Sequence, residues 1–168
     1  MNMKEIEHKI YTGYSGIRKP AESYRKLIEQ AVLAVLRSED VDIPCVVSVL
    51  ITNDEGIRKY NRDYRKIDTP TDVLSFPMQE FKKAGWNNRS NTGLDRNTGE
   101  LPLGDIILSS ETVKRQATEY ETGYKRETAY MMIHSTLHLL GYDHIAGSDE
   151  KVMPDKQKLI MKDMGYDD

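Results

Sequence analysis

The sequence of 168 residues predicts an α+β fold in which helices pack on a small mixed β-sheet. Strand and helix patterns alternate at the start of the chain, and two further strand patterns follow with no helix between them. Every pattern after residue 109 is helical. Because the later helices cluster instead of alternating with strands, a mixed sheet is expected rather than a purely parallel one. The length fits one domain covering residues 1–168.

The first half of the chain carries two strand patterns and two helix patterns. Polar and apolar residues alternate over His8–Tyr14, which predicts a strand. Pro20–Arg37 has apolar residues at helical spacing and begins with a proline suited to a first helical turn. The β-branched run Cys45–Ile51 predicts a buried strand. Asn53 then offers a side-chain oxygen that caps a helix extending to about Tyr64.

The second half begins with two short strand patterns, Thr71–Phe76 and Leu103–Ser109. Between them, Phe81–Glu100 is rich in Asn, Gly, Thr and Arg and has no periodicity, which predicts a long exposed loop. Helical patterns complete the chain at Ser110–Glu121, at Tyr124–Leu140 and within Ser148–Met164.

The composition excludes several classes of protein. With 38% hydrophobic and 30% charged residues, the chain is not expected to be disordered, collagenous or membrane-embedded. Its single cysteine, Cys45, cannot close an intramolecular disulfide, which favours a reducing compartment such as the cytoplasm. No apolar stretch is long enough to span a membrane, so no membrane partner is expected. The formal charge of −3 requires any nucleic-acid contact to use local basic patches.

Three of the four histidines lie within HSTLHLLGYDH, at His134, His138 and His144. Residues four apart on a helix share a face, so the first two imidazoles can reach one ion. The third ligand requires the helix to end, and Gly141 is placed to adopt the left-handed conformation that ends it. Three protein ligands leave a fourth position for water, as in catalytic zinc sites. The cluster therefore predicts one ion per chain, zinc or another divalent transition metal.

A lone histidine on an apolar helix is more often a packed core residue than a ligand, but the joint spacing favours a metal site. The spacing is similar to that of metzincin proteases, with one difference. Ser135 stands where an HExxH protease carries its general-base glutamate, and serine has no useful basicity near neutral pH. Peptide hydrolysis by that mechanism is disfavoured, although attack by a metal-bound hydroxide is still compatible with the sequence, and no general base can be identified.

Three blocks carry a family resemblance: NRDYRKIDTPTDVLSFP at Asn61–Pro77, LGDIILS at Leu103–Ser109 and HSTLHLLGYDH at His134–His144. In this order they resemble the YbeY-type single-strand endoribonucleases, also called rRNA maturation factors. The resemblance implies a zincin-like α+β fold, a metal held by the three histidines and hydrolysis of RNA phosphodiesters. It also implies roles in small-subunit rRNA maturation and ribosome quality control. The long loop between Met78 and Leu101 departs from the more compact family pattern.

A basic segment precedes the first strand of the second half. Its cationic residues are Arg58, Lys59, Arg62, Arg65 and Lys66. Arg58, Lys59, Arg62 and Lys66 are candidate contacts for RNA phosphates, and Tyr60 and Tyr64 offer faces for unstacked bases. A solvated helix surface is the alternative interpretation.

Arg65 has a more specific expectation. In the resemblance it matches the family's functional arginine before the Pro-Thr-Asp-Val-Leu-Ser-Phe run. The resemblance implies a catalytic role for Arg65, in which the guanidinium supports charge that develops on the scissile phosphate. Asp143 is a candidate for orienting the neighbouring His144 or assisting proton transfer, and capping of its loop is an equal alternative.

These observations lead to the prediction of a metal-dependent endoribonuclease. Its expected partners are single-stranded RNA, including rRNA, and the ribosomal small subunit or associated proteins. Two rival functions are a metallohydrolase acting on peptides or amides, and a ribosome-associated RNA-binding factor with a structural metal.

Overall fold

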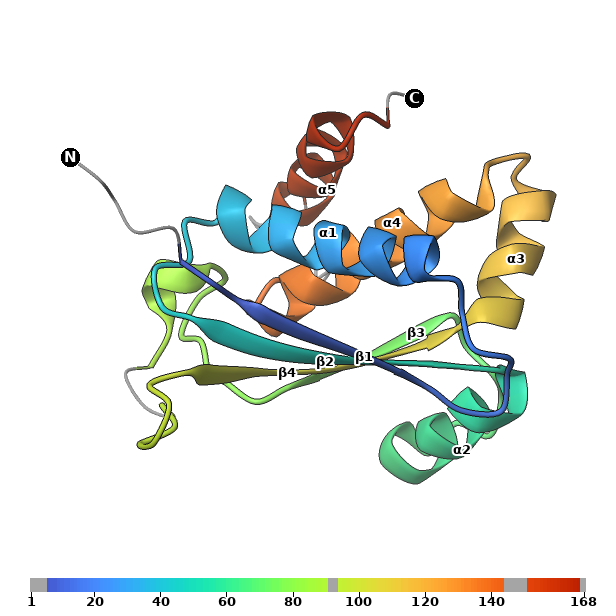
Figure 1. Ribbon diagram of the computed structural model, residues 1–168, viewed down its shortest axis with the longest axis horizontal. Coiled ribbons are helices and arrows are strands. Elements are labelled where there is room, and N and C mark those ends of the chain that lie inside the picture. The colour runs from blue at the N-terminus through green and yellow to red at the C-terminus, as the bar shows by residue number, and fades with distance from the viewer. Residues whose placement is uncertain (1–5, 91–93, 144–150, 167–168) are drawn as a thin grey trace.

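The computed structural model describes residues 6–90, 94–143 and 151–166. Its helices and strands follow the predicted order along the chain (Figure 1). The strands are β1 (Lys9–Tyr14), β2 (Cys45–Thr52), β3 (Val73–Pro77) and β4 (Leu101–Ser109). The helices are α1 (Glu22–Ser38), α2 (Asp54–Arg65), α3 (Ser110–Glu119), α4 (Tyr124–Leu139) and α5 (Val152–Asp163), with a short 3₁₀ turn, η1, at Trp86–Asn88.

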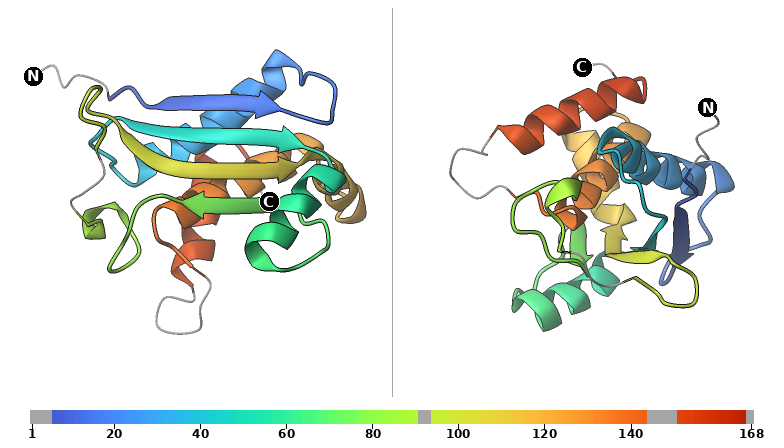
Figure 2. Two further views of the ribbon diagram at one scale, coloured as in Figure 1. Left: turned by 90° about the horizontal axis from the view of Figure 1, so that it is seen from below. Right: turned by 90° about the vertical axis from the view of Figure 1, so that its left-hand side faces the viewer.

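The four strands form one mixed sheet in the order β1-β2-β4-β3, which confirms the predicted fold class. Strands β1, β2 and β4 are parallel, and β3 pairs antiparallel with β4 along one edge. Helices α1 and α4 cover one face of the sheet, whereas α2 lies on the other face (Figures 1 and 2). Helix α5 packs against α4 and α1. The edge strand β3 therefore separates two environments, one beside α4 and one beside α2.

Helix α4 is the central helix of the fold because it contacts α1, α3, α5, β3 and β4. Within Met131–Leu140, only His134 and His138 are not buried. Each buried aliphatic side chain stabilises the fold by roughly 1.5–3 kcal/mol. The apolar residues around the two histidines thus fix the helix firmly while leaving both imidazoles accessible.

Three local expectations can be compared with the structure. Asn53 caps α2 as predicted, because its Oδ1 accepts a hydrogen bond from the Gly56 N–H at 2.8 Å. Pro20 was expected inside the first helical turn, but α1 begins at Glu22. The third expectation, an exposed loop over Phe81–Glu100, was based on the polar composition of this segment. Trp86 in this segment is buried and donates through Nε1 to Asp42 Oδ1 at 2.7 Å, so the expectation of an exposed loop is wrong for this part.

Among the described residues, no helix is both long enough and apolar enough to cross a membrane.

Candidate active site

Helix α4 brings His134 and His138 together as the four-residue spacing predicted. Their imidazole rings lie 4.5 Å apart between centroids and meet edge to face. The two Nε2 atoms are 3.0 Å apart. The side chains occupy one helix face, so both can contribute to a single site.

Both histidines face a cleft of about 710 Å³ between α4 and the edge strand β3. Residues of α4, β3 and the turn after α4 line it, together with Arg65 from the end of α2. Polar and aromatic lining residues include Arg65, Thr71, Asp72, Gln79, Tyr130, His134, His138, Tyr142 and Asp143. An open, mainly polar cleft of this size has room for a nucleotide-sized segment.

The orientation of His138 is fixed by the turn that follows α4. Gly141 has a φ of 89°, the left-handed conformation that the sequence predicted for this position. The turn directs the Tyr142 carbonyl oxygen to 2.7 Å from His138 Nδ1. A carbonyl oxygen can only accept, so His138 carries its proton on Nδ1. In the neutral ring, Nε2 is then the nitrogen that carries the lone pair required for metal ligation.

The spacing of the pair also fits a metal. Two nitrogen ligands at about 2.0–2.1 Å from a tetrahedral zinc ion lie roughly 3.3 Å apart. The observed separation of 3.0 Å between the Nε2 atoms is within a few tenths of an ångström of this value. The predicted third ligand, His144, lies outside the described residues. Within those residues, no group of three His, Cys, Asp or Glu side chains suited to a metal is found.

Arg65 enters the same cleft from a separate element. It is the last residue of α2, and Lys66 ends the helix in the left-handed conformation with a φ of 61°. The Arg65 side chain is exposed and has no hydrogen bond or ion pair with the described residues. Its guanidinium is therefore available to an anion in the cleft.

The other basic residues of α2 differ in their availability. Arg58 is engaged by Asp68 through two hydrogen bonds of 2.9 and 3.2 Å, and Arg62 contacts Asp63 at 3.2 Å. These carboxylates neutralise part of the predicted basic patch, and the two guanidiniums are exposed. The Lys66 ammonium donates to a backbone carbonyl at 3.1 Å.

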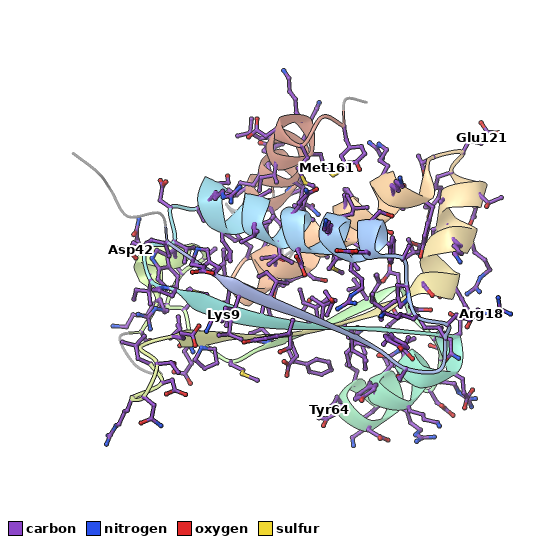
Figure 3. The ribbon with its side chains drawn as sticks, in the orientation of Figure 1. Lys9, Arg18, Asp42, Tyr64, Glu121 and Met161 are labelled. Atoms are coloured by element: carbon purple, nitrogen blue, oxygen red, sulfur yellow. The ribbon has the colours of Figure 1, made fainter. Side chains whose placement is uncertain are left out.

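Tyr60 and Tyr64 lie on α2, on the side of the sheet away from α4 (Figure 3, which labels Tyr64). Their rings stack at 6.4 Å, and Tyr64 also meets Phe76 edge to face at 5.2 Å. Together they line a second groove of about 620 Å³. The structure thus places both tyrosines outside the histidine cleft.

The carboxylates of the cleft have different surroundings. Asp72 is held by its neighbours, because it accepts from the Val73 N–H at 2.7 Å and from Gln116 at 3.2 Å. Asp143 is exposed at the rim of the cleft. Ser135, at the position of the protease glutamate, is fully buried and is not a lining residue. A protease-type general base is therefore absent from this position.

Two residues of the site were missed by sequence reasoning. Tyr130 lies one helical turn before His134, stacks on its ring at 6.5 Å and lines the cleft. Its four-residue spacing from His134 was an available signal. Gln157 on α5 contacts His134, with its amide nitrogen 2.9 Å from Nδ1. No sequence pattern indicated which face of α5 meets α4.

Comparisons with known proteins place the chain among the endoribonucleases. A family model described as "Endoribonuclease YbeY" matches residues 11–165. The chain therefore belongs to the endoribonuclease YbeY family, which confirms the resemblance found in the sequence.

Individual relatives agree with this assignment. "Endoribonuclease YbeY" of Clostridium kluyveri is 40% identical over 146 residues, covering 84% of this chain and 89% of the relative. The protein of the same name from Agathobacter rectalis is 41% identical over 146 residues, covering 84% and 88%. The solution structure of TM1509 from Thermotoga maritima superposes with a TM-score of 0.59 at 25% identity, covering 93% of this chain and 89% of that one.

Proposed function

We propose that the cleft between α4 and β3 hydrolyses phosphodiester bonds of single-stranded RNA, with one zinc or other divalent transition-metal ion held by His134, His138 and His144. The endoribonuclease family supports the reaction class. The observation that carries the proposal is the orientation of His138. Its Nδ1 lies 2.7 Å from the Tyr142 carbonyl oxygen, and its Nε2 points toward His134 Nε2 at 3.0 Å, a separation that fits two nitrogen ligands of one ion.

The bound ion would supply Lewis-acid polarisation of a phosphate oxygen and acidification of a water molecule. The residues of the chain supply binding and orientation. Arg65 offers a guanidinium from the end of α2 to the non-bridging oxygens, where negative charge develops during phosphoryl transfer. Tyr130 presents an exposed aromatic ring beside His134, on which an unstacked base can pack.

The hydroxyl of Tyr142, a residue that lines the cleft, remains protonated. Burial, together with the nearby Glu39, raises the pKa of the Tyr142 hydroxyl above its usual range. The phenol therefore adds no negative charge to a cleft proposed to bind phosphate, and Asp143 is the exposed carboxylate at its rim. We assign Asp143 to orientation of His144 or to proton transfer.

The family and the sequence support a proposal for the biological setting. We propose that residues 1–168 act as one endoribonuclease domain on rRNA, at or near the ribosomal small subunit. We further propose a cytoplasmic location, in keeping with a single buried cysteine that forms no disulfide. Burial raises the pKa of the Cys45 thiol to about 12, so this side chain remains an inert thiol.

The proposal is tested by elemental analysis of purified protein beside His138→Ala. The wild-type protein is expected to carry about one transition-metal ion per chain, and the variant to lose it while keeping its circular dichroism spectrum. Full metal occupancy in His138→Ala would refute the ligand assignment. A folded wild-type protein that takes up no metal would refute the metal site.

A further inference from the structure

A second groove adjoins the histidine cleft, at the boundary between helices α4 and α5. Its volume is about 220 Å³, and Tyr130 lines both this groove and the cleft. The buried residues Gln157 and Met161 of α5 form part of its wall (Figure 3 labels Met161). Gln157 also contacts the cleft, because its amide nitrogen lies 2.9 Å from His134 Nδ1. The groove therefore continues the cleft past Tyr130.

The charged residues that line this groove are cationic. Lys158 and Lys162 come from α5 and Arg126 from α4, and no carboxylate is found among the described residues of the lining. Both lysines are exposed and have no hydrogen bond or ion pair with the described residues. Since they are four residues apart on one helix, they present two neighbouring positive charges. Arg126 contributes less, because it lies 3.8 Å from the buried carboxylate of Glu127.

Another groove also leaves the histidine cleft, between α3 and α4, and its charge is different. Its volume is about 410 Å³, and it shares Asp72 and Tyr130 with the cleft. Its described lining holds the carboxylates of Asp72 and Glu127 against one cation, Arg126. An excess of carboxylates disfavours a phosphate in this groove. The distribution of charge therefore favours the groove between α4 and α5 as the path of a polyanion that extends beyond the cleft.

We propose that single-stranded RNA bound in the histidine cleft continues through the groove between α4 and α5, where Lys158 and Lys162 contact its phosphates. This inference rests on the proposed function, because it takes the cleft as the binding site of RNA. A lysine binds a phosphate as a point charge, so these contacts suit a strand of any sequence. An α-helix rises 1.5 Å per residue, so the groove as far as Arg126 extends the site by about 12 Å beyond His134.

The test compares a short and a long RNA, because only a long strand reaches the groove. The probes are a uridine dinucleotide, which the cleft alone can hold, and an oligouridylate of about twelve nucleotides. In the double variant Lys158→Gln/Lys162→Gln, the affinity for the long strand should fall. The slope of log affinity against log salt should decrease by about 1.4, which is about 0.7 for each lost phosphate contact. The affinity for the dinucleotide should stay at the wild-type value.

The matched control is Lys114→Gln/Lys125→Gln, which makes the same change in net charge. Both lysines are exposed, and they line a separate pocket near the start of α4 instead of the groove. This control should keep the wild-type slope for the long strand. Fluorescence anisotropy measures binding of the long strand, and titration followed by NMR measures binding of the dinucleotide. Circular dichroism and thermal unfolding show whether each variant folds.

The outcomes distinguish failure of this inference from failure of the proposed function. A folded Lys158→Gln/Lys162→Gln variant that keeps the wild-type affinity and slope for the long strand would overturn the inference. Equal decreases of the slope in the two double variants would also overturn it, because net charge alone would then explain the effect. An equal loss of affinity for the dinucleotide would contradict a site beyond the cleft. A wild type that binds neither RNA would instead refute the proposed function.

Discussion

At the scale of single residues, Arg65 is the side chain that we propose stabilises the charge developing during the reaction. The side chain lines the histidine cleft and has no partner among the described residues. A guanidinium aimed at charge that develops on the phosphate stabilises the transition state more than the bound substrate. Arg65→Ala should therefore lower the single-turnover cleavage rate by roughly 10²-fold or more, with metal content unchanged.

Arg62→Ala is the matched control for this prediction. Arg62 is also an exposed arginine of α2, but it contacts Asp63 and does not line the cleft. Its removal should leave the single-turnover rate near that of the wild type. Equal rates for Arg65→Ala and the wild type at saturating enzyme would show that Arg65 has no role in the chemical step.

The sequence predicted part of the site at this scale, and the reason is geometric. His134 and His138 share one helix, so their spacing alone places them on one face, and the structure confirms that face. Gln157 and Tyr130 were not predicted. Contact between Gln157 and His134 depends on how α5 packs on α4, which is decided by tertiary packing and leaves no local pattern.

At the scale of elements, the turn after α4 should be sensitive to side-chain size. A Cβ added at Gly141 would lie 2.7 Å from Phe81 Cβ, in addition to the strain of a φ of 89°. Gly141→Ala should therefore destabilise the protein by about 2–4 kcal/mol, the sum of backbone strain and overpacking. It should also weaken metal binding, because the turn positions the Tyr142 carbonyl against His138.

Gly165→Ala isolates the contribution of the backbone. Gly165 has a nearly equal φ of 92°, but a Cβ there would meet nothing within 4 Å. This variant should lose only about 1–2 kcal/mol and keep its metal affinity. Urea denaturation and chelator competition measure both quantities. Equal losses of stability in the two variants would contradict the importance of the Phe81 contact.

A second prediction at this scale concerns Asp54, which joins α2 to the start of α3. Its carboxylate accepts hydrogen bonds from Ser109 at 2.7 Å, Thr112 at 2.6 Å and Arg115 at 2.7 Å. Burial alone would raise the pKa of Asp54, but these hydrogen bonds and the charge of Arg115 together lower it below its usual value. The ionised form is therefore favoured by folding.

Because the folded pKa is lowered, this contribution to stability is fully present above the unfolded pKa of about 3.9 and is lost as pH falls through the folded pKa. Asp54→Asn should lower the free energy of unfolding by about 1–3 kcal/mol at neutral pH. The difference in free energy of unfolding between Asp54→Asn and the wild type should become smaller below about pH 4. Urea titrations at neutral and acidic pH measure this difference. A difference that stays constant with pH would contradict a stabilising role for the ionised Asp54 carboxylate.

The order of helices and strands was predictable because each long element carries its own periodicity. The Asn53 cap was predictable for the same reason, since capping is local. The burial of Trp86 was not, because a single aromatic residue in an aperiodic polar segment does not reveal its distant partner Asp42. Local chemistry therefore predicts the elements, whereas long-range contacts decide which loop residues enter the core.

At the scale of the whole molecule, a net charge of −3 limits RNA binding to local contacts. Lys59 has no hydrogen bond or ion pair with the described residues, whereas Arg58 is held by Asp68. Lys59→Ala should therefore reduce the slope of log affinity against log salt by about 0.7, as expected for one lost contact to a single strand. Arg58→Ala should reduce the slope by less. The slopes are measured by fluorescence anisotropy with a single-stranded oligonucleotide. A larger reduction of the slope for Arg58→Ala than for Lys59→Ala would contradict the expectation that Lys59 is the more available phosphate contact.

The proposed mechanism requires a metal held in the histidine cleft for cleavage of RNA. The most direct measurement is the single-turnover cleavage rate of single-stranded RNA by rigorously nuclease-free protein, stripped of metal and then reloaded with zinc in steps. We expect no cleavage by the stripped protein and a rate that rises in proportion to bound zinc up to one ion per chain. Full cleavage by metal-free protein would contradict a metal-dependent reaction in this cleft.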